Sequence, residues 1–272
     1  MKHGDRRPIA VFDSGVGGIS VLAELVELMP RESFLYFGDS LHAPYGIRTS
    51  AEVSALTEQH IEALVHRGAK AVVIACNTAT GASIARLRQK YDGIPVIGIE
   101  PAVKPAVQAF PGGRILVLAT PITLSTEKFR TLLRSYSEQA EIFPVPCPQL
   151  AALIEEGELS GERLDGYLAE IFRSYRERPI DAVVLGCTHY PFVREAVAAA
   201  SGGAALFDGG AGTARETRRQ LEKRGMLSDR TEAGTVELDN SDPQPMRMRL
   251  CEELLRFGRK YCRERRKNRA DA

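Results

Sequence analysis

Two stretches, Ala71-Val-Val-Ile-Ala-Cys-Asn-Thr78 and Ala182-Val-Val-Leu-Gly-Cys-Thr-His189, decide the fold of this chain because they nearly repeat each other. Each is an apolar, β-branched run that ends in a small residue and a cysteine, followed by polar residues able to start a helix. Such a run predicts a buried parallel strand. Open α/β sheets bind ligands at the carboxyl ends of their strands, so Cys76 and Cys187 stand where chemistry is usually done. The repeat predicts two matched thiols facing one substrate.

The residues around the first stretch alternate between strand and helix patterns. A glycine-rich turn over 13–18 separates the first strand from the first helix, and the later connections are short. This βαβαβαβ order argues for a parallel, doubly wound sheet. The predicted strands cover 9–12, 34–37, 71–75 and 96–99, and the predicted helices cover 19–28, 54–67 and 82–89.

The pattern then begins again with strands over 114–120 and 205–208, a helix over 125–133 and a returning helix over 213–223. Ile115 follows Ile9 by 106 residues, and Cys187 follows Cys76 by 111. These offsets predict an α/β fold of two pseudo-symmetric, doubly wound parallel-sheet domains with the active site between them. We expect residues 1–99 and 208–256 to form the first domain and 100–207 the second. Residues 257–272 are expected to be a solvated basic C-terminal tail at the end of a helix.

Composition narrows the class of ligand. The 272 residues carry 36 basic and 35 acidic side chains, a net charge of +1, which disfavours nucleic acid as a partner and leaves small metabolites as the default ligand. No long apolar segment follows the charged N-terminal residues, and no stretch approaches the ~20 apolar residues of a membrane span. We therefore expect a cytoplasmic protein without a membrane partner.

The five cysteines are an odd number without a C-x-x-C pair, which disfavours a disulfide framework or a zinc nucleus. Cys147 and Cys251 are interpreted as buried apolar residues, and Cys262 as incidental. Ser20 stands where a dinucleotide fingerprint requires its third glycine. No metal and no cofactor are expected.

The thiols themselves suggest a reaction. A thiol at a helix N-terminus has a lowered pKa and can act as a base or a nucleophile. Covalent catalysis requires one attacking group and an oriented base, whereas a mirrored pair suits proton removal on one face of a carbon and delivery on the other. The pair therefore predicts racemisation or epimerisation without a cofactor.

Polar residues beside the thiols are candidate auxiliaries. Asp13 ends the first strand and His189 follows Cys187 by two positions, so each can hold or take a proton near a thiol. Asn77, Thr78 and Thr188 lie at expected helix starts, where hydroxyl, amide and backbone N–H groups bind carboxylates. Taken alone, each of these residues would be interpreted as a helix cap or turn residue.

Five motifs together resemble the glutamate racemases of the cofactor-independent aspartate/glutamate racemase family. They lie in order over residues 8 to 215 and comprise Asp13-Ser-Gly-Val-Gly-Gly18, Gly38-Asp-Ser40 with Pro44-Tyr-Gly46, Ala75-Cys-Asn-Thr-Ala79, Glu100-Pro-Ala102 and Gly186-Cys-Thr-His-Tyr-Pro191. The resemblance implies two pseudo-symmetric α/β domains, an isomerase that interconverts L- and D-glutamate by two-base proton transfer at Cα, and no cofactor.

The resemblance also implies roles for single residues. Cys76 would act on D-glutamate with help from Asp13, and Cys187 on L-glutamate with help from His189 and Glu155, although Glu156 adjoins Glu155. His42 departs from the arginine often found in the family. The implied substrate-binding residues are Asp13, Ser14, Tyr45, Gly46, Asn77, Thr78, Thr188 and His189.

Further implications are the supply of D-glutamate for peptidoglycan synthesis, a role in cell shape, and a homodimer. Three alternatives stay open from the residues: a racemase for aspartate or another amino acid, a metabolite-binding protein that has lost turnover, and a single-cysteine decarboxylase or isomerase. The presence of both Cys76 and Cys187 disfavours the last two.

Overall fold

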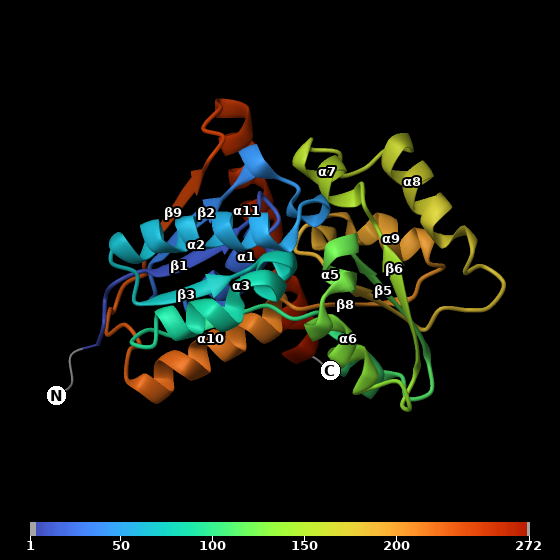
Figure 1. The fold of residues 1–272 in the computed structure, drawn as a ribbon, viewed down its shortest axis with the longest axis horizontal. Coiled ribbons are helices and arrows are strands. Elements are labelled where there is room, and N and C mark those ends of the chain that lie inside the picture. The colour runs from blue at the N-terminus through green and yellow to red at the C-terminus, as the bar shows by residue number, and fades with distance from the viewer. Residues whose placement is uncertain (1–3, 271–272) are drawn as a thin grey trace.

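Two parallel β-sheets lie side by side in the computed structural model, which describes residues 4–270, with side chains described through residue 267 (Figure 1). The first sheet has the strand order β4-β3-β1-β2-β9 and the second the order β6-β5-β7-β8. The strands are β1 (Ile9–Asp13), β2 (Phe34–Gly38), β3 (Ala71–Ile74), β4 (Val96–Gly98), β5 (Arg114–Ala119), β6 (Glu141–Pro146), β7 (Ala182–Leu185), β8 (Ala205–Asp208) and β9 (Val236–Asn240).

Helices connect and cover these strands. They are α1 (Ile19–Leu28), α2 (Ser50–His66), α3 (Asn77–Lys90), α4 (Val103–Ala109), α5 (Pro121–Ser125), α6 (Glu127–Arg134), α7 (Leu150–Glu155), α8 (Glu162–Arg173), α9 (Arg194–Ala200), α10 (Gly210–Arg224) and α11 (Pro245–Ala270). Three short 3₁₀ turns, η1 (Ser40–His42), η2 (Tyr45–Ile47) and η3 (Tyr190–Val193), follow strands β2 and β7. No helix in residues 4–270 is long and apolar enough to cross a membrane.

The two sheets have corresponding strand orders. Strands β1, β2, β3 and β4 of the first sheet correspond to β5, β6, β7 and β8 of the second. With this correspondence the order β4-β3-β1-β2 becomes β8-β7-β5-β6, which is the order of the second sheet given from its other edge. Every strand pair in both sheets is parallel. The predicted fold class of two parallel-sheet α/β domains is therefore confirmed, and β3 and β7, which precede the two cysteines, are counterparts.

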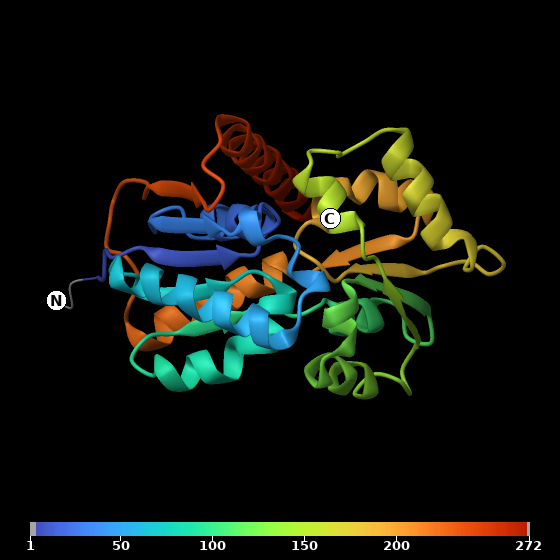
Figure 2. The same cartoon turned by 45° about the horizontal axis from the view of Figure 1, so that its top comes forward.

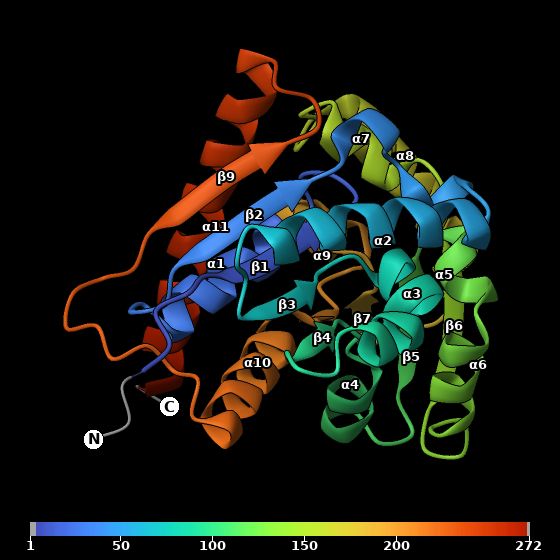
Figure 3. The ribbon, with the colours of Figure 1, turned by 60° about the vertical axis from the view of Figure 1, so that its left-hand side comes forward.

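Alternating side chains of the central strands are buried on both faces of each sheet. Ile9 and Val11 of β1 pack on the side of α1, whereas Ala10 and Phe12 pack on the side of α2 and α3. Figure 3 shows this layering, with α2 in front of β2, β1 and β3 and with α1 and α11 behind. Because inward residues of β5 and β7 join the same core as Ile9 and Val11, one apolar core runs through both halves.

The chain passes between the sheets twice, from β4 to α4 and from β8 to α10. It returns to add β9 beside β2 at the edge of the first sheet. No strand was predicted at β9, because Val236-Glu-Leu-Asp-Asn240 carries acidic residues and is largely half-exposed. An edge strand with one open side has this mixed composition.

The C-terminal segment differs from its prediction. A solvated, fraying tail was expected beyond residue 257, but α11 continues through Ala270 and packs along α1. Figure 2 shows α11 in red over the first half of the molecule. Its basic residues pair with acidic residues of α1, as Arg259 and Arg263 do with Glu27, and Cys262 is buried rather than incidental. The acidic partners on α1 give this basic run a surface to pack on.

Candidate active site

The two thiols lie at corresponding ends of corresponding strands. Cys76 follows β3 and caps α3, where its Sγ accepts a hydrogen bond from the N–H of Ala79 (3.4 Å). Cys187 follows β7 and precedes η3. Their exposed fractions are only 5% and 9%. Each half of the molecule thus contributes one nearly buried cysteine from the carboxyl end of a central strand, which is the placement predicted from the repeat.

The glycine-rich turn after β1 allows the second half of the molecule to approach closely. A Cβ added at Gly15 would overlap the carboxylate of Glu155, and a Cβ at Gly17 would overlap the imidazole of His189. The glycines therefore serve close packing between the halves.

Hydrogen bonds join the two halves around the thiols. Thr188 Oγ1 donates to Asp13 Oδ2 (3.0 Å), and Ser20 Oγ donates to the carbonyl oxygen of Thr188 (2.8 Å). Thr78 Oγ1 lies 3.1 Å from the hydroxyl oxygens of both Thr120 and Thr123. Residues predicted from separate motifs are thus brought together at the boundary between the halves.

Cys187 lies next to a buried ion pair. His189 Nδ1 is 3.6 Å from Cys187 Sγ, and His189 Nε2 is 2.6 Å from Glu155 Oε1. Burial alone would lower the pKa of His189, but its contacts with Cys187 and Glu155 raise that pKa well above the usual value. Burial alone would raise the pKa of Glu155. Hydrogen bonds from His189 and Val16 and the charge of Arg247 outweigh burial, so the pKa of Glu155 is lowered. An imidazolium paired with a carboxylate therefore stands beside this thiol.

Glu155, and not its neighbour Glu156, is the residue brought to His189. Glu155 ends α7 and is buried, whereas Glu156 is 54% exposed and pairs with Arg163 on the surface. The sequence alone left these two carboxylates undistinguished because they are adjacent. Their position at the last turn of α7 turns their side chains in different directions.

Cys76 has different neighbours. Its Sγ lies 3.5 Å from Ser14 Oγ, and no hydrogen bond joins it to Asp13 in the described part of the chain. Burial and the nearby charge of Asp13 raise the pKa of Cys76 to about 12, and burial raises the pKa of Asp13 to about 6. The expectation that a helix N-terminus would lower the pKa of this thiol is wrong for the free protein, because desolvation outweighs the helix.

The loop with Tyr45 and Gly46 is fixed by a buried carboxylate. Tyr45 Oη donates to Asp39 Oδ2 (2.7 Å), and the same carboxylate contacts His42 Nδ1 (2.8 Å) and His60 Nε2 (3.1 Å). Ligand atoms of Asp39, His42 and His60 lie within 4.8 Å of one another. The contacts to one carboxylate account for this convergence, which was not predicted because His60 lies on α2, outside the motifs.

Asn77 is the remaining predicted binding residue. It lies in the first turn of α3, and its buried Oδ1 has no hydrogen-bond partner within the described residues. It borders a pocket of about 280 Å³ formed between α3 and the segment of α5 and α6. An unpaired buried acceptor beside open space suits a donor group of a ligand.

Two contributors were not predicted. Ser40 Oγ donates to Glu155 Oε2 (3.0 Å), and Arg247 Nη1 donates to the same atom (2.9 Å). Ser40 stood inside a quoted motif, so its position after β2 was an available signal. Arg247 lies 92 residues beyond Glu155 in a basic stretch, where nothing in the pattern distinguishes it from its neighbours.

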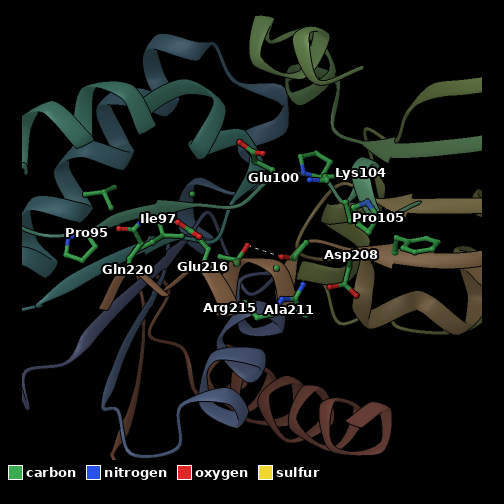
Figure 4. Close-up of a pocket in the computed structure, with 18 of the residues that line it drawn as sticks. Pro95, Ile97, Glu100, Lys104, Pro105, Asp208, Ala211, Arg215, Glu216 and Gln220 are labelled. Carbon is green, nitrogen blue, oxygen red and sulfur yellow. Dashed lines mark hydrogen bonds between the residues drawn. The ribbon is translucent and has the colours of Figure 1, made fainter. Parts of the chain in front are cut away.

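A larger cavity lies elsewhere in the described part of the chain. It has a volume of about 1020 Å³ and is bordered by both chain crossings, including Glu100 and Asp208. Figure 4 shows Lys104, Arg215 and Glu216 around it. Neither Cys76 nor Cys187 borders this cavity. The thiols are instead enclosed by the contacts between the halves described above.

The sequence of this chain is similar to known proteins over most of its length. The family model described as Asp/Glu/Hydantoin racemase matches residues 13–217. A glutamate racemase of Clostridium botulinum (strain Alaska E43 / Type E3) is 46% identical over 250 residues, covering 92% of this chain and 97% of that protein. A glutamate racemase of Clostridium acetobutylicum is 49% identical over 234 residues, covering 86% and 91%.

Solved structures show the same likeness. Glutamate racemase from Francisella tularensis in complex with D-glutamate has a TM-score of 0.81 at 27% identity, covering 93% of this chain and 94% of that one. The Escherichia coli glutamate racemase in complex with L-glutamate and the activator UDP-MurNAc-ala has a TM-score of 0.80 at 30% identity, covering 93% and 95%. With a matching family model over most of its length and relatives at nearly half identity, this chain belongs to the Asp/Glu/Hydantoin racemase family.

Proposed function

We propose that the protein is a glutamate racemase that interconverts L- and D-glutamate without a cofactor, by proton transfer between Cα and the thiols of Cys76 and Cys187. The observation that carries the proposal is the placement of these two nearly buried thiols at the ends of counterpart strands β3 and β7, one from each half. The choice of glutamate as the substrate rests on the relatives, since the similar curated proteins and solved structures reported above are glutamate racemases.

In the direction from L- to D-glutamate, Cys187 acts as a thiolate and removes the Cα proton. The electron pair of the C–H bond stays on Cα and is delocalised into the α-carboxylate, and Cys76 then donates its thiol proton to the opposite face. His189 Nδ1 lies 3.6 Å from Cys187 Sγ, where the imidazole is placed to exchange a proton with that sulfur. A pKa of about 12 keeps Cys76 protonated and ready to donate.

The reverse reaction exchanges the roles of the thiols. Cys76 must then lose its proton before it can act on D-glutamate. Asp13 is the nearby carboxylate, and its charge contributes to the raised pKa of Cys76. Above about pH 6 Asp13 is ionised and can accept a proton, and Ser14 connects the two groups because its Oγ lies 3.5 Å from both Asp13 Oδ1 and Cys76 Sγ. We assign Asp13 to the Cys76 half-reaction on this basis.

Substrate binding is assigned to the polar groups that surround the thiols. The N-terminal turn of α3 offers backbone N–H groups and a partial positive charge to a substrate carboxylate. The buried acceptor of Asn77 suits the substrate ammonium group. The complete proposed set is Asp13, Ser14, Tyr45, Gly46, Asn77, Thr78, Thr188 and His189.

Acidifying the Cα proton requires strong stabilisation of the carbanion. Hydrogen bonds to the α-carboxylate are strongest where water is excluded, and the near-complete burial of both thiols provides such surroundings. Entry of glutamate then requires the two halves to separate, so we propose opening and closure around the substrate as part of each turnover.

The wider assignments follow the same proposal. We assign residues 1–99 and 208–256 to one domain and 100–207 to the other, which places β9 with the first sheet. The product D-glutamate would serve peptidoglycan synthesis and hence cell shape, in the cytoplasm. The E. coli relative solved with a UDP-MurNAc-ala activator supports this connection.

A substrate panel tests the proposal. Purified protein is incubated with L-glutamate, D-glutamate and both enantiomers of aspartate without added cofactor, and optical rotation is followed. Cys262→Ala, whose thiol is buried in α11 away from the site, serves as the matched control. Racemisation of glutamate by both proteins supports the proposal. Turnover of aspartate alone would change the substrate, and no turnover of any amino acid would favour a binding protein.

A further inference from the structure

Arg247 lies in the first turn of α11, far in sequence from every residue proposed for the reaction. Its side chain is 19% exposed, and its guanidinium reaches across to the end of α7. There Nη1 donates to the backbone carbonyl oxygen of Glu155 (2.5 Å) and to its Oε2 (2.9 Å). On the other side, Nε lies 3.5 Å from Asp242 Oδ2, which holds the guanidinium in place.

Glu155 accepts four groups in total. Besides Arg247 and Ser40 on Oε2, its Oε1 accepts the N–H of Val16 (2.7 Å) and contacts His189 Nε2 (2.6 Å). Arg247, Ser40 and Val16 belong to segments that pack with the first sheet, whereas Glu155 and His189 belong to segments that pack with the second. The carboxylate is therefore oriented by one half and in turn orients the imidazole of the other.

These contacts form a continuous path from α11 to a thiol. It runs from Arg247 through Glu155 and His189 to Cys187 Sγ, with donor–acceptor distances of 2.9, 2.6 and 3.6 Å. Among the described side chains, no arginine or lysine forms a hydrogen bond or an ion pair with Asp13 or Ser14, the residues beside Cys76. The path is specific to one of the two thiols.

We propose that Arg247 is a positioning residue for the half-reaction of Cys187: it fixes the Glu155 carboxylate and thereby the orientation and charge of His189. The inference rests on the proposed function and extends it to the C-terminal helix. Arg247 touches neither thiol, so its effect passes through Glu155. Hydrogen bonds to a charged group are the strong class, and their loss in a buried site changes both charge and geometry.

The asymmetry gives a specific kinetic signature. The two enantiomers have equal free energy in water, so kcat/KM must be the same in both directions for any variant. A slower Cys187 step therefore lowers kcat/KM equally for the two enantiomers. It is detected instead by the isotope effects, which differ between them. With L-glutamate deuterated at Cα, Cys187 removes the label and the isotope effect rises. With D-glutamate deuterated at Cα, Cys76 removes the label and a slower later step at Cys187 makes the isotope effect fall.

The experiment compares wild type, Arg247→Met, Arg247→Lys and the control Arg263→Met, which removes an arginine of the same helix that pairs with Glu27. We expect Arg247→Met to lower kcat by about tenfold or more, the rate equivalent of one hydrogen bond to a charged group. The isotope effects for L- and D-glutamate should move in opposite senses. Arg247→Lys should recover part of both changes, and Arg263→Met should match wild type.

A merely structural role predicts another result. If Arg247 only holds the two halves together, Arg247→Met raises KM for both enantiomers alike and leaves both isotope effects unchanged. That result overturns the inference, while wild-type turnover still supports the proposed function.

A second readout does not depend on turnover. The proton NMR signal of His189 Nε2–H, in a 2.6 Å contact with Glu155, should move upfield in Arg247→Met and stay in place in Arg263→Met. An unmoved signal would also overturn it.

Discussion

Replacing Asp13 by asparagine should make the folded protein more stable at neutral pH while it removes the proposed activity. Asp13 is completely buried at the end of β1, and burial raises the pKa of its carboxyl from the usual 3.8 to about 6. The positive charge of His189 and hydrogen bonds from Thr188 and the Gly15 N–H oppose this rise without cancelling it. The ionised carboxylate is therefore held in the folded chain at a cost.

The size of that cost follows from the difference in pKa. Roughly two pKa units between the folded and unfolded chain correspond to ~3 kcal/mol at ~1.4 kcal/mol for each unit. The folded state binds the proton more tightly, so this contribution favours folding below about pH 4 and is lost as pH rises through about 6. Asparagine carries no charge, and its amide can still accept from the Gly15 N–H and donate to Thr188 Oγ1.

Urea unfolding followed by circular dichroism measures the effect. At about pH 7.5, Asp13→Asn should exceed wild type in free energy of unfolding by about 1 to 3 kcal/mol, and the difference should shrink toward zero near pH 4. Asp165→Asn, an exposed carboxylate on α8, is the control and should show no such pH dependence. A less stable Asp13→Asn protein at about pH 7.5, or a gain independent of pH, would refute the reasoning.

Two further substitutions test close packing and a buried ion pair. Gly17→Ala places a Cβ against the His189 imidazole and should lower racemase kcat about tenfold or more with an unchanged far-ultraviolet spectrum; a fully active variant would contradict the packing argument. Lys70 Nζ lies 2.6 Å from Glu32 Oε2, and both side chains are buried. Lys70→Met removes this partner of Glu32 and should lower the free energy of unfolding in urea by about 3 to 5 kcal/mol. Adding Glu32→Gln should restore much of that stability, and no recovery would argue against a paired charge.

The buried central strands and the thiols were predictable from the sequence because their signals are local, whereas the edge strands β6 and β9 were not predicted. An apolar, β-branched run that ends at a small residue has few outcomes besides a buried strand, and the repeat of that run at Cys76 and Cys187 placed both thiols at sheet ends. The matching strand orders of the two sheets confirm the inference from repeat spacing. The family motifs then supplied the rest of the proposed site residues.

The contacts that connect the site were not predictable in the same way. Arg247 reaches Glu155 only because α11 packs on α1, and residue 247 was assigned to the first domain with no local signal of that contact. The pKa of Cys76 was predicted in the wrong direction because the helix N-terminus is visible in sequence, whereas complete desolvation is not. Long-range packing, which decides burial, is the information that local patterns lack.

The central claim is that each thiol serves one face of Cα, and deuterium exchange in single-thiol variants tests it most directly. Wild type, Cys76→Ala, Cys187→Ala and the control Cys262→Ala are incubated with L- or D-glutamate in D₂O without cofactor, and Cα deuterium is followed by NMR. The account predicts racemisation by wild type and control, none by either single-thiol variant, and residual exchange confined to L-glutamate in Cys76→Ala and to D-glutamate in Cys187→Ala. Racemisation by either variant would contradict it.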